Sequence, residues 1–266
     1  LNQEQWAKVS NAAYAAAGKA PLDIALNPEV GGAGVNYQDE IFRTAPTQNY
    51  SLGFLGGSDN LKYSMSLNYF NQGGVIKEAD YDGFNMGVRS DYKKGIFKIG
   101  ETILLTKEKR KELPGIPGQG RNVLGAAITM IPGFAIYEEN AIGGYGGASG
   151  SVTDIFNPVA ALNLFDVTSD TYQALINTYV EATFLKDFKY KLNVGATVSE
   201  FKRDNYTPRY EVGGFFKNLD NDLVHTDEFN LYTQVENTLN YTKSFGKHYV
   251  NALAGYTVYN NGFKSV

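Results

Sequence analysis

Residues that could bind a metal or act in acid–base catalysis are sparse in this sequence. The chain has no cysteine and only two histidines, His225 and His248. No thiolate site can form, and the usual spacings of metal-binding His and Cys are missing. Glu138 and Glu139 are adjacent, but neighbours on an extended chain point in opposite directions, which favours two solvated loop charges over an acid–base pair. We therefore predict no catalytic residue, no metal site and no cofactor, and we expect that the chain is not an enzyme.

Two glycine-rich stretches, 31–34 and 115–120, superficially resemble phosphate-binding loops. Neither follows a buried strand and opens a helix, as a dinucleotide-binding fingerprint requires. Loop flexibility explains both stretches better. The formal net charge of −4 also lacks the basic footprint of a nucleic-acid-binding protein, so we expect no nucleic-acid partner.

Aromatic and charged side chains in two long connections are the best candidates for ligand contact. The connection 112–169 contains an expected short helix at 122–131, followed by aromatic residues among glycines. Connections longer than about 12–15 residues are commonly functional. Aromatic rings on loops can stack on sugar faces or fill apolar peptide pockets, while polar neighbours orient the ligand. We hypothesise that the following residues face an external cavity and include ligand contacts: Tyr137, Glu138, Tyr145, Tyr206, Arg209 and Tyr210. The alternative role of each is packing against neighbouring loops or a covering protein.

Strands must position these connections, because apolar and polar residues alternate over most of the chain. Within Lys62–Phe70, the odd-numbered residues 63–69 are apolar and the even-numbered residues 62–68 are polar, which is the period-2 signature of a strand with one apolar face. Many of the strands reach the roughly 9–11 residues needed to cross a bilayer at a tilt. We predict eight strands, at 47–56, 61–75, 81–93, 96–111, 170–185, 188–204, 227–243 and 248–262.

The connections between these strands alternate between short and long. Tight polar turns are expected at 57–60, 93–95, 185–187 and 244–247, and longer excursions at 73–80, 112–169 and 205–226. A membrane barrel shows this asymmetry, with short periplasmic turns on one rim and long extracellular loops on the other. A soluble β-sandwich, whose strands also alternate, is the competing fold.

The N-terminal region differs from the rest of the chain. The stretch Asn2–Ala17 is expected to form a short helix that Gly18 and Pro21 end. Its predicted apolar face holds Trp6, Val9, Ala13 and Ala16. The first residues show neither a basic n-region nor an apolar h-region, so we expect any export signal to lie upstream or to have been removed.

Several motifs carry a family resemblance. The run Tyr37–Tyr50 reads YQDEIFRTAPTQNY, and Tyr69–Lys77 reads YFNQGGVIK. Further matching runs lie at 156–160, 184–187 and 236–256. In this order along the chain, they resemble the SusC/RagA-like family of TonB-dependent outer-membrane transporters.

The resemblance implies an all-β fold, a segment of a large transmembrane antiparallel β-barrel of the roughly 22-stranded plugged class. The expected organisation is a helix-containing loop leading into a strand (1–46), strands (47–111), a long extracellular loop (112–169) and strands (170–262). The plug and the remaining strands are expected outside this chain. The implied location is the outer membrane of a Gram-negative cell.

The function that the resemblance implies is active, TonB-energised import of an oligosaccharide or a peptide. The expected partners are a SusD-like surface lipoprotein that acts as a lid, TonB through an N-terminal part missing from this chain, and outer-membrane lipid. Tyr63 and Tyr69 are expected to face lipid or the interfacial aromatic girdle. Two other functions stay open at this point: a passive structural or adhesive surface barrel, and a soluble carbohydrate-binding module.

Overall fold

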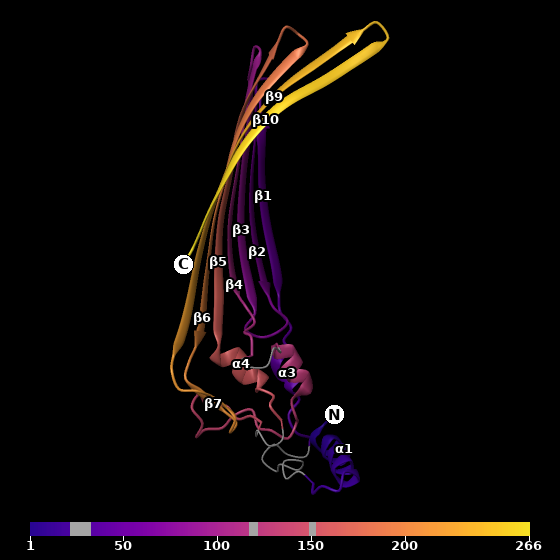
Figure 1. Cartoon of the computed structure of the whole chain (residues 1–266), viewed down its shortest axis with the longest axis vertical. Helices are drawn as coiled ribbons and strands as arrows, with labels where there is room; N and C mark the ends of the chain where they lie inside the picture. The colour runs from indigo at the N-terminus through magenta and orange to yellow at the C-terminus, as the bar shows by residue number, and fades with distance from the viewer. Residues whose placement is uncertain (22–32, 117–121, 149–152) are drawn as a thin grey trace.

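The computed structural model describes residues 1–21, 33–116, 122–148 and 153–266. Its main element is one antiparallel sheet of eight long strands in the order β1-β2-β3-β4-β5-β6-β9-β10. Figure 1 shows the strands running side by side, with the helices gathered at one end of the sheet. The strands are β1 (Thr47–Gly57), β2 (Leu61–Gly73), β3 (Asp80–Lys94), β4 (Phe97–Lys111), β5 (Asp166–Phe184), β6 (Phe188–Thr207), β9 (Asp222–Phe245) and β10 (His248–Ser265).

All eight predicted strands are confirmed, but three of them reach further toward the long connections than the sequence indicated. β5 begins at residue 166, β6 ends at 207 and β9 begins at 222. The added residues continue the ladder, since Tyr206 pairs with Asp166 on one side and with Leu223 on the other. Paired backbone groups satisfy one another even where the side-chain alternation has faded. The predicted excursion 205–226 is therefore shorter than expected, and it holds a small hairpin of β7 (Tyr210–Val212) and β8 (Phe216–Asn218).

The two ends of the sheet differ. Strand pairs β1–β2, β3–β4, β5–β6 and β9–β10 join through short turns at one end, and the longer connections all lie at the other. Gly95 and Gly246 adopt a φ of 59° in two of the short turns, which is the left-handed conformation that tight hairpins need. We call the two ends of the sheet the turn end and the loop end.

Cross-strand register gives the sheet one mainly apolar and one mainly polar face. On the apolar face, one row of paired residues is Leu52, Leu67, Met86, Leu105, Ala174, Val198 and Leu231. The row beside it on the polar face is Ser51, Asn68, Asn85, Thr106, Gln173, Ser199 and Asn230. Because the side-chain period is two, this register keeps like residues on the same side across the sheet.

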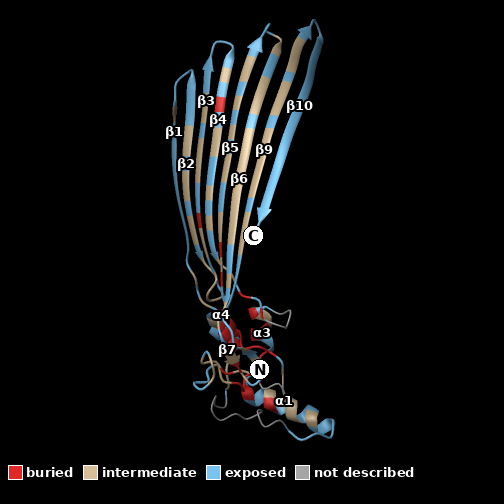
Figure 2. Ribbon diagram, turned by 60° about the vertical axis from the view of Figure 1, so that its left-hand side comes forward, coloured by how far each residue is buried: buried red, intermediate tan, exposed pale blue. Residues whose placement is uncertain are grey.

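The sheet does not cover its own apolar face. Leu52 is 62% exposed and Phe54 is 54% exposed. Figure 2 shows buried residues concentrated below the loop end, while the strands are mostly intermediate or exposed. A second long sheet, which a β-sandwich requires, is absent from the described part of the chain. The soluble sandwich is therefore not the fold observed.

Four short helices lie around the loop end. α1 (Gln3–Ala16) is confirmed, with Asn2 and Gln5 forming a reciprocal capping box. Its predicted apolar face is confirmed only at Trp6, which packs against the buried core, whereas Val9, Ala13 and Ala16 are exposed. Gln3 and Ala7 are buried while Val9 is 61% exposed, because the backbone N–H of Gln3 bonds the Ala33 carbonyl (3.0 Å) and turns that side of the helix inward. The other helices are α2 (Tyr37–Ile41), α3 (Val123–Thr129) and α4 (Pro158–Leu164).

Of these, α3 was expected, whereas α2 and α4 were not. No helix of the described residues is both long enough and apolar enough to cross a bilayer. The glycine stretches 31–34 and 115–120 fall largely outside the described residues.

Candidate functional site

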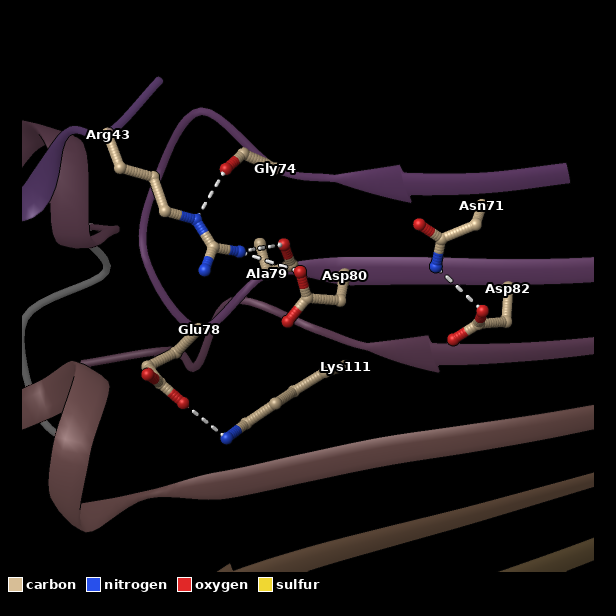
Figure 3. Close-up of polar contacts among 8 residues, drawn as sticks. All are labelled: Arg43, Asn71, Gly74, Glu78, Ala79, Asp80, Asp82 and Lys111. Atoms are coloured by element: carbon tan, nitrogen blue, oxygen red, sulfur yellow. Dashed lines mark hydrogen bonds and ion pairs between the residues drawn. The ribbon is translucent and has the colours of Figure 1, made fainter. Parts of the chain in front are cut away.

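The candidate site is built on the loop cluster, which we define as the described residues of 33–46, 74–79, 112–165 and 208–221. A polar junction joins it to the sheet (Figure 3). Arg43 donates to the carbonyls of Gly74 (3.1 Å) and Ala79 (3.2 Å) and to the Asp80 carboxylate (2.6 Å). The ammonium of Lys111, on β4, lies 2.5 Å from the Glu78 carboxylate in the same connection. The Arg43 contacts hold the β2–β3 connection against the segment that enters β1, and the Lys111–Glu78 pair ties the same connection to β4.

A hydrophobic core holds the loop cluster together. It draws on α2, α3, α4 and the β7–β8 hairpin, which lie far apart in the sequence. Tyr37 is buried, and its hydroxyl donates to the Phe134 carbonyl (3.0 Å). Burial raises the pKa of the Tyr37 hydroxyl still further above physiological pH, where a tyrosine hydroxyl is already a hydrogen-bond donor. The described residues of the long connection 112–165 therefore form a folded unit rather than a loose loop.

Asn157 is the central polar residue of this core and is fully buried. Its Oδ1 caps α4 by accepting from the backbone N–H groups of Val159 (3.0 Å) and Ala160 (3.2 Å). Its Nδ2 donates to the carbonyls of Ile136 and Gly146, both at 2.9 Å. One side chain thus fixes the start of α4 and the loop opposite it.

The 134–148 loop and the β7–β8 hairpin meet through glycines. The Glu211 N–H donates to the Ile142 carbonyl (2.7 Å). Gly213 adopts a φ of 59°, and a Cβ atom there would lie 2.3 Å from the Ala148 carbonyl oxygen. Only glycine permits both this backbone conformation and this approach.

A partly exposed aromatic pair lies beside this contact. Tyr137 and Tyr145 form an isolated antiparallel bridge with ring centroids 5.5 Å apart. Tyr137 is 64% exposed, whereas Tyr145 is half-buried, and burial together with the neighbouring Tyr137 raises its pKa. A shallow cavity of about 390 Å³ adjoins the pair, and its lining includes Glu138, Glu211 and four glycines. The arrangement offers an aromatic surface next to hydrogen-bond acceptors.

The predicted ligand residues fall into two groups. Tyr137, Glu138 and Tyr145 lie together in the 134–148 loop. Tyr206 and Arg209 lie at the other connection, where the Tyr206 hydroxyl (3.4 Å) and the Arg209 N–H (3.1 Å) both donate to the side-chain oxygen of Asn221.

Tyr210 packs in the core of the loop cluster, which is the alternative role predicted for each of these residues. It is only 5% exposed, and its ring lies edge-on against Phe156 (5.6 Å) and Phe165 (5.5 Å). Its neighbour Glu211, which the sequence analysis did not single out, lines the cavity with Glu138. No local signal could have paired two glutamates so distant in the chain.

The two histidines lie at opposite ends of the sheet. His225 is at the loop end of β9, with its Nδ1 2.6 Å from the Asp204 carboxylate. His248 begins β10 and pairs with Phe245 at the turn end. Twenty positions of β9 separate these two points, a distance of roughly 65 Å. Within the residues that the structure describes, no three His, Cys, Asp or Glu side chains gather as a metal site would need.

Comparison with known proteins finds stretches of bacterial receptors that are similar to this chain. No family model matches the chain. It is 31% identical over 238 residues to the TonB-dependent receptor P3 of Formosa agariphila, covering 85% of this chain and 23% of that protein. It is 23% identical over 259 residues to the TonB-dependent receptor SusC of Bacteroides thetaiotaomicron, covering 86% and 24%.

The fold has a solved counterpart as well. The structure of the RagAB peptide importer in its open-open state matches with a TM-score of 0.69 at 20% identity, over 88% of this chain and 26% of that one. The chain therefore spans about a quarter of the length of the proteins it matches. The predicted resemblance to SusC/RagA-like receptors and the predicted barrel-type fold are both confirmed for this stretch.

Proposed function

Since this chain matches a stretch of TonB-dependent receptors in sequence and in fold, we propose that it forms part of the wall of an outer-membrane β-barrel that imports a nutrient. The sheet would cross the bilayer, the short turns would face the periplasm and the loop cluster would lie outside the cell.

The observation that carries this proposal is the apolar band on one face of the sheet. Near the loop end the band is bordered by an aromatic row, whose paired residues are Tyr50, Tyr69, Phe84, Lys107, Tyr172, Glu200 and Phe229. Toward the turn end, aromatic residues recur on the same face at Tyr63, Phe97 and Tyr190. Such paired girdles mark the two interfaces of a membrane barrel.

The height of the band fits a bilayer. On β5, Tyr172 and Ala182 lie ten positions apart, and Ala182 pairs with Tyr190 in the turn-end row. At about 3.3 Å per residue the separation is roughly 33 Å along the strand, and a tilt of about 40° reduces it to roughly 25 Å along the membrane normal. That value matches the apolar band of outer-membrane barrels, about 25 Å tall.

The edges of the sheet support a larger barrel. β1 and β10 each pair on one side only. Unpaired backbone groups inside lipid cost several kcal/mol each, so we propose that further strands continue the sheet beyond both edges. Eight strands would then form one arc of the wall, consistent with the quarter of the RagAB chain that this arc matches.

The loop cluster supplies the proposed substrate contacts. Tyr137, which is exposed, and its half-buried partner Tyr145, with Glu138 beside them, present an aromatic surface that fits either a sugar face or an apolar peptide side chain. Tyr206 and Arg209 would contribute from the other connection, and Tyr210 would hold them in place from the core. A peptide or an oligosaccharide is the proposed cargo. A SusD-like lipoprotein is the proposed lid over this end, and TonB is the proposed energy source through another part of the protein.

Uptake by cells that produce the full-length protein tests this function. A fluorescent peptide library and a set of labelled oligosaccharides are offered to the producing strain and to a strain with the gene deleted. The expected result is accumulation of one cargo class that a protonophore abolishes, since TonB-linked transport needs the proton gradient of the inner membrane.

Two outcomes contradict the proposal. Accumulation that persists in the presence of the protonophore indicates a passive barrel. Recovery of the folded protein from the soluble fraction without detergent contradicts membrane import altogether.

A further inference from the structure

The apolar face carries a groove just inside the aromatic row. The groove has a volume of about 480 Å³ and its lining is mainly apolar. Its lining includes Phe84, Leu105, Lys107, Tyr172, Ala174 and Val198. These residues come from β3, β4, β5 and β6, and Phe229 of β9 also lines the groove, which therefore crosses five adjacent strands.

The groove exists because a small residue stands between larger ones. Ala174 on β5 pairs with Leu105 on β4 and with Val198 on β6. In the next row toward the loop end, Lys107 on β4 pairs with Tyr172 on β5. The single methyl group of Ala174 leaves the space that its neighbours border.

A cation stands at the rim of this apolar hollow. The Lys107 ammonium lies 5.4 Å from the centre of the Tyr172 ring. No carboxylate of the described residues forms an ion pair with it, and the carboxylate of Glu200, which also lines the groove, is already paired with the Lys202 ammonium at 2.9 Å. Lys107 lines the groove, and the apolar stem of a lysine can border such a hollow while its charged end reaches the polar edge.

We propose that this groove binds a phosphate-bearing membrane lipid, with one acyl chain along Ala174 and the headgroup phosphate against Lys107. The inference rests on the proposed function, because it requires the apolar face to lie in the membrane. The aromatic row marks the depth of the interface, and lipid phosphates lie at that depth. A basic side chain at the border of an apolar groove thus complements both halves of the lipid, the charged headgroup and the acyl chain.

Native mass spectrometry on the full-length protein in detergent tests the proposal. Dioleoyl phosphatidylglycerol is the probe, and dioleoylglycerol, with the same chains and no phosphate, is its uncharged counterpart. We expect the wild-type protein to retain the phospholipid roughly tenfold better than the uncharged lipid, or about 1.4 kcal/mol. Lys107→Gln should abolish this preference, Lys107→Arg should keep it, and Ala174→Phe should lower retention of both lipids.

Two matched variants serve as controls. Lys191 also lies over a tyrosine ring, that of Tyr179 at 4.5 Å, but on the polar face, so Lys191→Gln should leave retention unchanged. Ala196 is on the apolar face outside the groove and pairs with Ile176 and Thr233, so Ala196→Phe should also have no effect.

The outcomes separate this inference from the proposed function. A phospholipid preference that survives Lys107→Gln, or retention that Ala174→Phe leaves unchanged, overturns the lipid site while import stands. Loss of retention in both control variants overturns it as well, because binding would then be unspecific. A folded protein found free of the outer membrane overturns the lipid site and the import proposal together.

Discussion

Substitution of Asn157 provides the sharpest test of the loop cluster as a folded unit. Asn157→Ala removes the cap of α4, which costs about 1 kcal/mol. It also removes the donor to the Gly146 carbonyl, a buried acceptor for which no second bond is found among the described residues. Leaving such a group unsatisfied costs about 1–3 kcal/mol. The Ile136 carbonyl still accepts from the N–H of Gly146 (2.9 Å), so the loss of its bond to Asn157 adds little to the destabilisation.

The expected loss is therefore about 2–4 kcal/mol of local stability. Hydrogen exchange on the full-length protein in detergent measures it, because amides that exchange by local opening report the opening free energy. At tenfold per 1.4 kcal/mol, amides of 159–164 and 136–146 should exchange roughly 30-fold to several-hundred-fold faster. Amides in the middle of β5 should be unaffected, since the sheet does not depend on this residue.

Two further variants divide the effect. Asn157→Ser keeps a capping oxygen but cannot reach Gly146, so it should recover about 1 kcal/mol relative to alanine. Asn163→Ala removes an exposed asparagine of the same helix, whose Nδ2 donates to the Val159 carbonyl (2.8 Å), and should change exchange less than threefold. Equal effects of Asn157→Ala and Asn163→Ala would refute the assignment of Asn157 as the polar centre of the cluster.

Three other predictions follow from the faces of the sheet and the contacts of the loops. Ile176→Arg places a charge in the middle of the apolar band and should lower the free energy of unfolding by about 2–4 kcal/mol, measured by urea unfolding in lipid vesicles, whereas Asn177→Arg on the polar face should not. Equal losses of stability in the two variants would argue against a lipid-facing side. Tyr137→Ala should weaken substrate binding about 5–10-fold by equilibrium titration through the loss of a stacking surface, and Tyr137→Phe should preserve it; unchanged affinity for the alanine variant would remove Tyr137 from the site. Gly213→Ala should accelerate amide exchange in the β7–β8 hairpin at least tenfold. The added Cβ atom would lie 2.3 Å from a carbonyl oxygen, and the left-handed φ alone costs about 1–2 kcal/mol for a non-glycine residue. An unchanged exchange rate would show that the two loops separate easily.

Much of the architecture could be read from the sequence, because the features concerned are local. Alternation of apolar and polar residues gives both the existence of a strand and its two faces. Polar turn residues then marked the short connections. The Asn–Pro pair at 157–158 was also a readable helix start, a cap followed by proline, but the helix it begins was missed because the whole of 112–169 was interpreted as a loop with one helix at 122–131.

What the sequence by itself determined, then, is the set of strands, their apolar and polar sides and the order of short and long connections. Only the tertiary structure decided that Tyr210 is buried, that Glu138 and Glu211 line one cavity, and that Ala174 leaves a groove beside Lys107. The physical reason is the distance along the chain between the residues that determine each feature. Side-chain alternation is fixed within a few residues, whereas burial, shared cavities and cross-strand gaps depend on register and loop packing between segments far apart in the chain.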